Sequence, residues 1–354
     1  MKETLFGKTL DELREVAATL GMPRHAAGQM AAWIYRRGVR EIGAMTDISA
    51  VRREALAERF DVGLSAPLRE AVSVDGTKKY LFSTAEGGRV ESAMIPDRGR
   101  SSVEGEGSGE GSGERATLCV SSQAGCRMGC AFCATGRQGL AHNLTAGDIL
   151  NQFASLPERE ALTNIVYMGM GEPLDNPDAV MRSLEILTAE WGYGWSPTRV
   201  TLSTAGVIPA MERFLSDSRV HLAVSLHNPF ADERAAIMPI ERAYPIERVV
   251  EAIRRHDFSG QRRVSFEYIV MSGINDSSRH IAGLTKLLNG LSCRVNLIRF
   301  HKIPDSPYFS PPMEKMEWFR DALSRKGVRT TIRASRGEDI AAACGLLSTS
   351  QIEN

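Results

Sequence analysis

The chain has 354 residues, of which 43% are hydrophobic, and its 43 Lys and Arg residues balance its 43 Asp and Glu residues. This length and composition fit a globular protein with one large domain and a smaller one, and the balanced charge excludes nucleic-acid binding through bulk basicity. Six cysteines are too few for a disulfide scaffold, no apolar run approaches the ~20 residues of a membrane span, and no signal-peptide pattern is present, so we expect a cytoplasmic protein without membrane contact.

The first part of the chain, residues 1–62, has a helical pattern. Thr9 and Glu12 stand three residues apart at the start of an amphipathic stretch, which is the spacing of a capping box. A second amphipathic stretch ends in the adjacent basic residues Arg36 and Arg37. The pattern predicts a small helical domain over residues 1–62.

Short β strands are expected next, over residues 63–96, because an Asp-Gly pair at position 75 and a Gly-Gly pair at position 87 interrupt strand-like stretches. These strands would form a β adaptor. Residues 97–115, "DRGRSSVEGEGSGEGSGER", are mostly Gly, Ser and charged residues. Such a composition cannot bury apolar surface, so this segment predicts a flexible loop.

From residue 116 to the end, strand-like and helix-like segments alternate. The strand-like segments lie at residues 117–122, 164–169, 199–204, 220–227, 263–271, 294–301 and 328–335. Alternation over about 200 residues predicts a parallel α/β domain, either an open sheet or a barrel. In α/β barrels the chemistry gathers at the C-terminal ends of the strands. We therefore expect residues 116–354 to form a catalytic domain with its site at that edge.

The stretch "AGCRMGCAFCATG" places Cys126, Cys130 and Cys133 directly after the first of these strands. A structural zinc site is one alternative, but a zinc ribbon needs a second pair of cysteines, and Cys293 and Cys344 stand alone. Three thiolates suit a [4Fe–4S] cluster that leaves one iron open to the amino and carboxylate groups of S-adenosylmethionine (SAM). The C-x3-C-x2-C spacing resembles that of the radical-SAM superfamily.

Polar motifs follow the next three strands as well. "MGMGEPLDN" contains Gly171, which allows close approach of the backbone to a ligand, and Glu172, whose carboxylate could bind the SAM ammonium group. "LSTAG" and "SLHNP" supply Ser203, Ser225 and His227. Each of these residues alone suits an ordinary turn or core position. Because all the motifs fall at strand C-termini, together they predict one site.

Several longer motifs together carry a family resemblance. They are "VESAMIP", "RATLCVSSQAGCRMGCAFCATG", "YMGMGEPLDN", "RVTLSTAGVIP", "VSLHNP", "MPIERAYPIE", "VMSGIND", "RVNLIRFH" and "RGEDIAAACG". Over nearly its whole length the chain resembles the radical-SAM adenine-C2 RNA methyltransferases, which in bacteria modify 23S ribosomal RNA and often tRNA. The resemblance implies a partial (β/α)6 radical-SAM barrel, preceded by the N-terminal helical domain and the short β adaptor.

The resemblance also implies a role for each site residue. Cys126, Cys130 and Cys133 would hold one [4Fe–4S] cluster per chain. The residues that would bind SAM are Gly171, Glu172, Ser203, Ser225, Leu226, His227 and His301, the last of which stands where many relatives have an asparagine. Cys344 would carry the methyl group as S-methylcysteine, Cys119 would resolve the adduct through a disulfide with Cys344, and Glu91 would be the proton acceptor.

The implied mechanism uses two SAM molecules per turnover. One methylates Cys344, and the other yields a 5′-deoxyadenosyl radical that removes hydrogen from that methyl group, so that a methylene radical adds to adenine C2. RNA stays attached to Cys344 until Cys119 attacks its sulfur. Adenine C2 is electron-poor, so a carbon radical can add where ordinary displacement cannot, and covalent catalysis divides the difficulty into steps.

The implied partners are 23S rRNA, tRNA and an electron donor such as flavodoxin or ferredoxin. We expect the enzyme itself to be a monomer. Arg36, Arg37, Lys78 and Lys79 would contact the RNA, although solvated surface charge is an equal alternative. Two other functions stay open. A sister family methylates adenine C8, confers antibiotic resistance and shares the cysteines and the mechanism. A non-catalytic RNA-binding factor on the same scaffold would need none of the catalytic residues.

Overall fold

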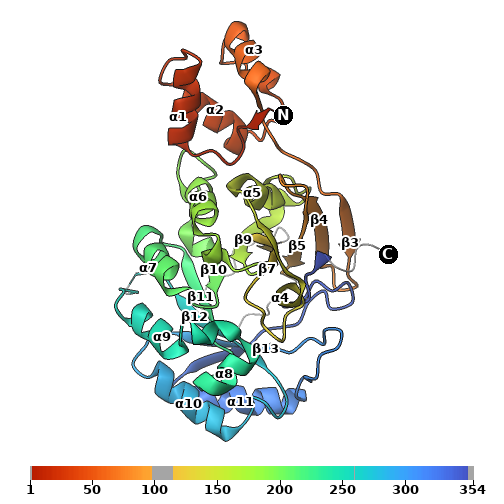
Figure 1. The fold of residues 1–354 in the computed structure, drawn as a ribbon, viewed down its shortest axis with the longest axis vertical. Coiled ribbons are helices and arrows are strands. Elements are labelled where there is room, and N and C mark those ends of the chain that lie inside the picture. The colour runs from red at the N-terminus through yellow and green to blue at the C-terminus, as the bar shows by residue number, and fades with distance from the viewer. Residues whose placement is uncertain (1, 98–114, 259, 350–354) are drawn as a thin grey trace, which may run out of the picture.

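The computed structural model describes residues 2–97, 115–258 and 260–349 (Figure 1). The N-terminal helices stand at one end of the molecule, and a long mixed sheet with helices packed outside it forms the rest. The predicted loop at residues 97–115 lies, except for its two end residues, outside the described residues. Within those ranges no helix combines the length and the apolarity needed to cross a membrane.

The N-terminal part is helical, as the sequence predicts. Its elements are β1 (Glu3–Thr4), α1 (Leu10–Thr19), α2 (Ala26–Ala31), a π-helical turn (Ala32–Arg36), α3 (Ala50–Arg59) and β2 (Phe60–Asp61). The capping box is confirmed, because the Thr9 hydroxyl accepts from the Glu12 N–H and the Glu12 carboxylate accepts from the Thr9 N–H. The strands β1 and β2 pair in parallel, which ties the two ends of this part together.

Ten of the described strands form one continuous sheet, in the order β14-β13-β12-β11-β10-β9-β6-β5-β4-β3. Their bounds are β3 Arg69–Val72, β4 Lys78–Ser83, β5 Arg89–Pro96, β6 Ala116–Cys119, β9 Leu162–Tyr167, β10 Val200–Thr204, β11 His221–Ser225, β12 Val264–Val270, β13 Arg294–Arg299 and β14 Arg329–Ile332. The strands from β6 to β14 run parallel, and β3, β4 and β5 join them antiparallel. The adaptor strands therefore extend the catalytic sheet.

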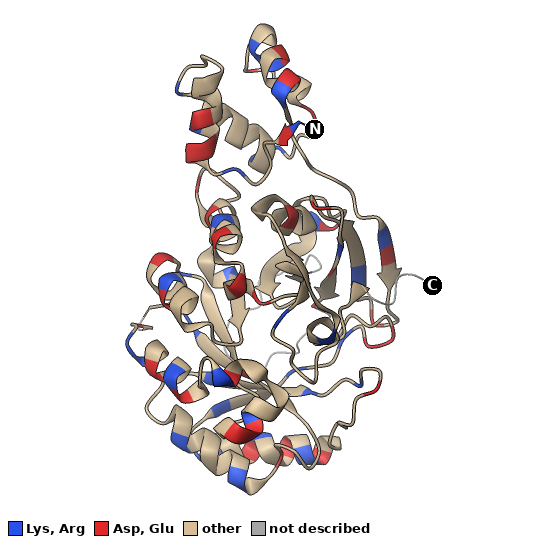
Figure 2. Ribbon diagram, in the orientation of Figure 1, with Lys and Arg blue, Asp and Glu red and all other residues tan. Residues whose placement is uncertain are grey.

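Helices follow each of the first six parallel strands, so the predicted partial (β/α)6 barrel is confirmed, with β14 added at its edge. The helices are α5 (Ala146–Ala154), α6 (Pro177–Thr188), α7 (Ile208–Asp217), α8 (Ala231–Ile237), α9 (Ile246–Arg254), α10 (Ser278–Leu288) and α11 (Met313–Arg325). Figure 2 shows acidic and basic residues interspersed on the outer helices, in keeping with the zero net charge.

Helix α9 illustrates why these segments pack as helices outside the sheet. Ile246, Val249, Val250 and Ile253 recur three and four residues apart, and all four are buried. This spacing places them on one face, which covers the sheet while charged residues occupy the other face. Burying each such side chain contributes about 1.5–3 kcal/mol, so the apolar face rather than intrinsic propensity holds the helix in place.

The ends of the 97–115 segment meet at one point of the sheet. The Asp97 N–H donates to the Arg115 carbonyl at 2.6 Å, and β5 and β6 pair directly behind them, with Ala93 opposite Cys119. Glu91 lies two residues from Ala93 on the same strand, so its side chain is on the Cys119 face of the sheet. The long sequence separation between Glu91 and Cys119 therefore does not separate them in space.

Candidate active site

The C-terminal ends of the parallel strands surround a cavity, called here the cluster cavity. Its wall combines the three closely spaced cysteines with residues at or just after the C-terminal ends of β9, β10 and β11. The predicted site residues that line it are Cys126, Cys130, Cys133, Gly171, Glu172, Ser203, Ser225, His227 and Cys344. Motifs that are far apart in the sequence thus meet at the edge of the sheet where chemistry gathers in such barrels.

A small hairpin that the sequence analysis missed holds the cysteine triplet. Strand β7 (Gln123–Cys126) ends at the first cysteine and pairs with β8 (Gly139–Asn143). Helix α4 (Ala134–Gln138) begins directly after Cys133, the last cysteine. Gly125 makes the close pairing possible: its φ is +81°, and a Cβ there would lie 1.8 Å from the Gly139 carbonyl oxygen.

The three thiols fit a [4Fe–4S] cluster by their chemistry. Burial raises the pKa of Cys126 to about 12 and also raises the pKa values of Cys130 and Cys133, so without a cation these thiols stay protonated. Bound iron would supply that cation and deprotonate them. Among the described residues no group of three or more His, Cys, Asp or Glu side chains has single-ion geometry. A four-iron cluster spreads its thiolates over several metal atoms instead.

Glu172 is a buried carboxylate at the wall of the cluster cavity. It accepts hydrogen bonds from the Leu174 N–H (3.0 Å), the Thr204 hydroxyl (2.7 Å) and the Ala205 N–H (2.7 Å). Burial raises its pKa to about 7 although these bonds favour the charged form. A ligand cation beside it would compensate the buried charge, so the SAM ammonium group fits this position chemically.

Gly171, next to this carboxylate, has a φ of +101°, and a Cβ there would lie 2.6 Å from the Gln123 side chain. Only glycine fits at this turn. His227 also adopts a positive φ, 56°. Its Nδ1 accepts from the Ile269 N–H at 3.0 Å, so a neutral ring carries its proton on Nε2. Burial lowers the pKa of His227 to about 3, and the neutral ring can donate a hydrogen bond from Nε2.

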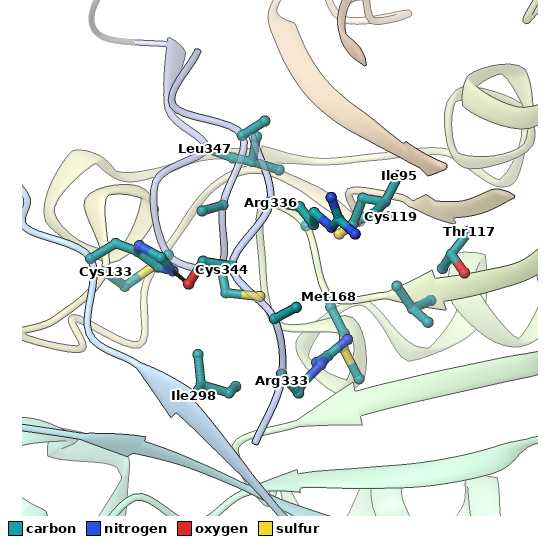
Figure 3. A pocket seen from close by; sticks show the side chains of 18 of the residues that line it. Ile95, Thr117, Cys119, Cys133, Met168, Ile298, Arg333, Arg336, Cys344 and Leu347 are labelled. Carbon is teal, nitrogen blue, oxygen red and sulfur yellow. Dashed lines mark hydrogen bonds between the residues drawn. The ribbon is translucent and has the colours of Figure 1, made fainter. Parts of the chain in front are cut away.

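A second cavity, called here the thiol cavity, contains both Cys119 and Cys344 (Figure 3). Cys119 is the last residue of β6, and Cys344 lies in the segment that follows β14. Both thiols are free. Cys344 and Cys133 line the thiol cavity and the cluster cavity alike, so the two spaces share a wall. Burial raises the pKa of Cys119 to about 12, and the nearby Cys344 thiol adds to that shift.

Helix α4 holds the chain that follows Cys344. The Ala134 N–H donates to the Gly345 carbonyl (2.8 Å), and the Thr135 hydroxyl donates to the Leu347 carbonyl (2.5 Å). Gln138 accepts from the Ser348 hydroxyl (3.1 Å) and donates to Thr349. Helix α4, which begins directly after Cys133, therefore also positions the segment that carries Cys344.

The chain before Cys344 is tied to the turn between β3 and β4. Asp75 accepts from the Gly337 N–H at 2.9 Å. Asp339 accepts from the Ser73 hydroxyl at 2.5 Å and from the Val74 N–H at 3.1 Å. Cys344 thus stands between two attachments, one to the antiparallel part of the sheet and one to α4.

Two of the predicted SAM-binding residues, Leu226 and His301, do not line the cluster cavity. Leu226 is buried and does not line the cluster cavity, and its carbonyl accepts from the Arg234 Nε at 2.9 Å. His301 lines the thiol cavity, with Nδ1 3.6 Å from a Glu338 carboxylate oxygen. The placement of these two residues therefore differs from that of the other predicted SAM-binding residues, which line the cluster cavity.

Glu91 lines neither cavity. Glu91 and Lys79 line a third cavity, and the Lys79 Nζ lies 3.0 Å from the Glu91 carboxylate. The Glu91 carboxylate also accepts from the Ser348 N–H at 3.0 Å. Burial raises the pKa of Glu91. Lys78 is similarly occupied by Glu70 (2.8 Å) and Glu158. The two lysines grouped with Arg36 and Arg37 as RNA contacts thus serve ion pairs within the protein, whereas both arginines are exposed.

Sequence reasoning missed Arg333 and Glu267, which line the cluster cavity together. Both are charged residues on a strand or directly after one, in "VSFEYIV" and "TTIRAS". Charged residues almost never lie buried inside a sheet unless they are paired, and that is the signal that could have found them.

Comparison with known proteins shows the family. Residues 120–284 match the model of the radical SAM superfamily, and residues 4–62 match that of the ribosomal RNA large subunit methyltransferase N-terminal domain. The chain is 53% identical over 350 residues to a "Probable dual-specificity RNA methyltransferase RlmN" of Parabacteroides distasonis, covering 99% of this chain and 98% of that protein. It is 41% identical over 339 residues to the "Dual-specificity RNA methyltransferase RlmN" of Syntrophotalea carbinolica, covering 96% and 88%.

A solved structure gives the same result for the fold. The crystal structure of a radical SAM methyltransferase from Sphaerobacter thermophilus superimposes with a TM-score of 0.86 at 40% sequence identity. The match covers 98% of this chain and 99% of that chain, so it includes the N-terminal helices as well as the barrel.

Proposed function

The chain belongs to the RlmN family of radical-SAM RNA methyltransferases, and we propose that it methylates C2 of an adenosine in 23S rRNA and in tRNA. The family membership supports the C2 position. The observation that carries the methyl-carrier mechanism is the position of Cys344. It stands in the wall between the cluster cavity and the thiol cavity, so one sulfur is accessible from both. A methyl carrier needs this arrangement, because it must meet the methyl donor on one side and the RNA base on the other.

Membership of the superfamily implies a [4Fe–4S] cluster and SAM. Cys126, Cys130 and Cys133 would hold the cluster, and Glu172 would hold the ammonium group of SAM. When bound, these groups supply a methyl group and a 5′-deoxyadenosyl radical, with two SAM molecules consumed per turnover. Gly171, Ser203, Ser225 and His227, which also line the cluster cavity, would orient SAM and exclude water from it.

The protein's own thiols would perform the transfer. Cys344 would accept the methyl group on Sγ. Once that methyl group has lost one hydrogen atom to the 5′-deoxyadenosyl radical, its carbon would bond to adenine C2, which leaves RNA attached through that sulfur. The cluster would supply the acceptor for the one electron left on the ring. The Cys119 thiolate attacks Cys344 Sγ. An S–S bond forms, the S–C bond breaks, and its electron pair goes to the departing carbon, which takes a proton. Glu91 is the proposed acceptor for the proton lost from the base, and burial raises the pKa of its carboxyl group, which makes the carboxylate a stronger base.

The N-terminal helices would contact the RNA. Arg36 and Arg37 are exposed cations in this part of the chain. The target base must leave its stack to reach the thiol cavity. We further propose that the enzyme works as a cytoplasmic monomer and receives electrons from a flavodoxin or a ferredoxin.

The test is base analysis of RNA treated anaerobically with iron-loaded protein, a reductant and SAM. Fragments of 23S rRNA and tRNA are digested and scored for 2-methyladenosine and 8-methyladenosine. We expect 2-methyladenosine from the wild-type protein and none from the Cys344→Ala variant. Cys293→Ala is the matched control, because Cys293 lies outside both cavities, and it should retain the product.

The alternative functions give different products. An enzyme of the C8-methylating sister family would yield 8-methyladenosine with the same dependence on Cys344. A non-catalytic RNA-binding factor would bind RNA and yield neither base. Either result would contradict the proposal.

A further inference from the structure

We propose that Arg333 is an electrostatic positioning residue for the thiol chemistry: its guanidinium, fixed by Glu267 at the junction of the two cavities, stabilises the thiolate form of Cys119. This inference rests on the proposed function, because it concerns the thiol that resolves the RNA adduct. Its test measures thiol ionisation directly and does not require methyl transfer.

Arg333 lies between the parts that the reaction must connect. It directly follows β14, and its backbone N–H donates to the Leu297 carbonyl at 2.8 Å, which continues the pairing with β13. Its side chain lines both the cluster cavity and the thiol cavity. Figure 3 shows it beside Met168, on the wall that also carries Cys119 and Cys344. The Arg333 Nη1 lies 3.4 Å from the Met168 sulfur.

A carboxylate holds this guanidinium in place. Glu267 is 4% exposed, and its Oε2 accepts from the Arg333 Nη1 at 3.3 Å. The other oxygen, Oε1, accepts from the Asn296 amide (2.8 Å) and the Ser265 hydroxyl (3.0 Å). Asn296 is itself fixed by the Thr331 hydroxyl at 2.8 Å. Side chains from β12, β13 and β14 therefore orient the anchor of a single arginine.

Glu267 is not the only group that interacts with the positive charge of Arg333. Burial works against the charged form of Arg333, but Glu267, Cys344 and Cys119, in that order, raise its pKa above the ordinary value. The interaction also affects Cys119. Burial and Cys344 raise the pKa of the Cys119 thiol, and Arg333 lowers it. A thiol at this depth needs a nearby cation to ionise.

The other titratable or charged residues around the thiol cavity are Cys133, His301, Arg336 and Cys344. Burial lowers the pKa of His301, so its ring is neutral and does not assist ionisation. Glu91 and Lys79 lie on the same face of the sheet but line the third cavity. Arg336 is a second cation on this wall, and unlike Arg333 it has no part in the Glu267 network. It is therefore the matched control.

The experiment follows the alkylation of Cys119 by iodoacetamide as a function of pH, in the anaerobic iron-loaded protein, with peptide mass spectrometry to separate the six cysteines. The variants are Arg333→Gln, Arg333→Lys and Arg336→Gln, and Cys293 is the internal reference. We expect Arg333→Gln to slow Cys119 alkylation at pH about 8 by about tenfold, which corresponds to a pKa increase of about one unit.

Lysine at position 333 should restore most of the rate because it keeps the charge, and Arg336→Gln should leave the Cys119 profile unchanged. The Cys293 rate should be the same in all proteins, which shows that the variants remain folded. Three results would overturn the proposal: a Cys119 profile that Arg333→Gln does not move, no reaction of Cys119 at any pH in the wild type, or weaker SAM binding by Arg333→Gln with unchanged Cys119 alkylation. The last result would make Arg333 a SAM ligand only.

Discussion

The two sets of thiols in this protein are positioned by different means. Cys126, Cys130 and Cys133 lie within eight consecutive residues, and one hairpin and one short helix aim them into the cluster cavity. Cys119 and Cys344 are more than 200 residues apart in the chain and meet only because β6 pairs deep in the sheet and the C-terminal segment is tied down on both sides.

This difference predicts which substitutions should disrupt each set of thiols. The triplet depends on local backbone geometry, so changes within the hairpin should remove iron. The Cys119–Cys344 pair depends on long-range hydrogen bonds to α4 and to the β3–β4 turn, so changes there should weaken methyl transfer while iron is retained. Three of the four predictions below test this separation, and the one on Glu172 tests the SAM site beside the triplet. They begin with the largest effect.

Replacing one thiol from each set should abolish methylation in distinguishable ways. Cys130→Ala removes a cluster ligand, so we expect loss of both bound iron and product. Cys344→Ala leaves the three ligands intact, so iron and SAM cleavage should remain while no methylated base forms. Iron content and 5′-deoxyadenosine production distinguish the two variants. Loss of iron in Cys344→Ala would show that the two sets are not independent.

Gly125→Ala should damage the local set through the backbone alone. The added Cβ would lie 1.8 Å from the Gly139 carbonyl at a φ of +81°, so the hairpin must distort. We expect destabilisation of about 2–4 kcal/mol together with poor iron retention. Thermal unfolding and iron content measure both. Gly28→Ala, in helix α2, is the control. Nothing lies within 4 Å of a Cβ added at Gly28, so this substitution should be neutral or slightly stabilising.

SAM affinity should depend on pH through Glu172. Its pKa is raised to about 7 by burial, so the carboxylate is charged above that pH and protonated below it. Because the ammonium group pairs with the charged form, affinity should rise as pH increases through 7, by about tenfold between pH about 6 and 8. Calorimetry at several pH values measures this. Glu172→Gln should bind weakly with a flat profile, and an equally steep profile in that variant would contradict the assignment.

Gln138→Ala should give the smallest effect and should affect the long-range set. It removes the side chain that holds Ser348 and Thr349, which costs about 1 kcal/mol of ordering in the segment carrying Cys344. We expect methylation to slow about fivefold with full iron content. Gln29→Ala removes one surface hydrogen bond far from α4 and should retain the wild-type rate. Iron loss in Gln138→Ala would tie α4 to the cluster instead.

Sequence patterns predicted the architecture well, because strand and helix periodicities are local signals. The seven strand-like segments after residue 116 and both adaptor turns are confirmed. The β7–β8 hairpin escaped notice because its four- and five-residue strands contain Gly, Gln and Asn, which are poor strand formers.

The site could be predicted only in part. Most residues that line the cluster cavity lie at or near the C-terminal ends of strands, so the parallel topology placed them. The position of His301 in the other cavity and the pairing of Glu91 with Lys79 depend on how the C-terminal segment crosses the sheet. No periodicity encodes that path. Arg333 was missed for a similar reason, since its place at the cavity wall follows from the pairing with the buried Glu267.

The hydrogen bond between the Asp97 N–H and the Arg115 carbonyl has a practical consequence for engineering. It holds Asp97 and Arg115 together at the rim of the sheet, so we expect this point of the chain to accept cargo whose own termini are adjacent. Lengthening such a connection costs only about 0.6 kcal/mol per doubling. A fluorescent reporter or an affinity tag placed there would label the enzyme while both natural chain termini stay unmodified.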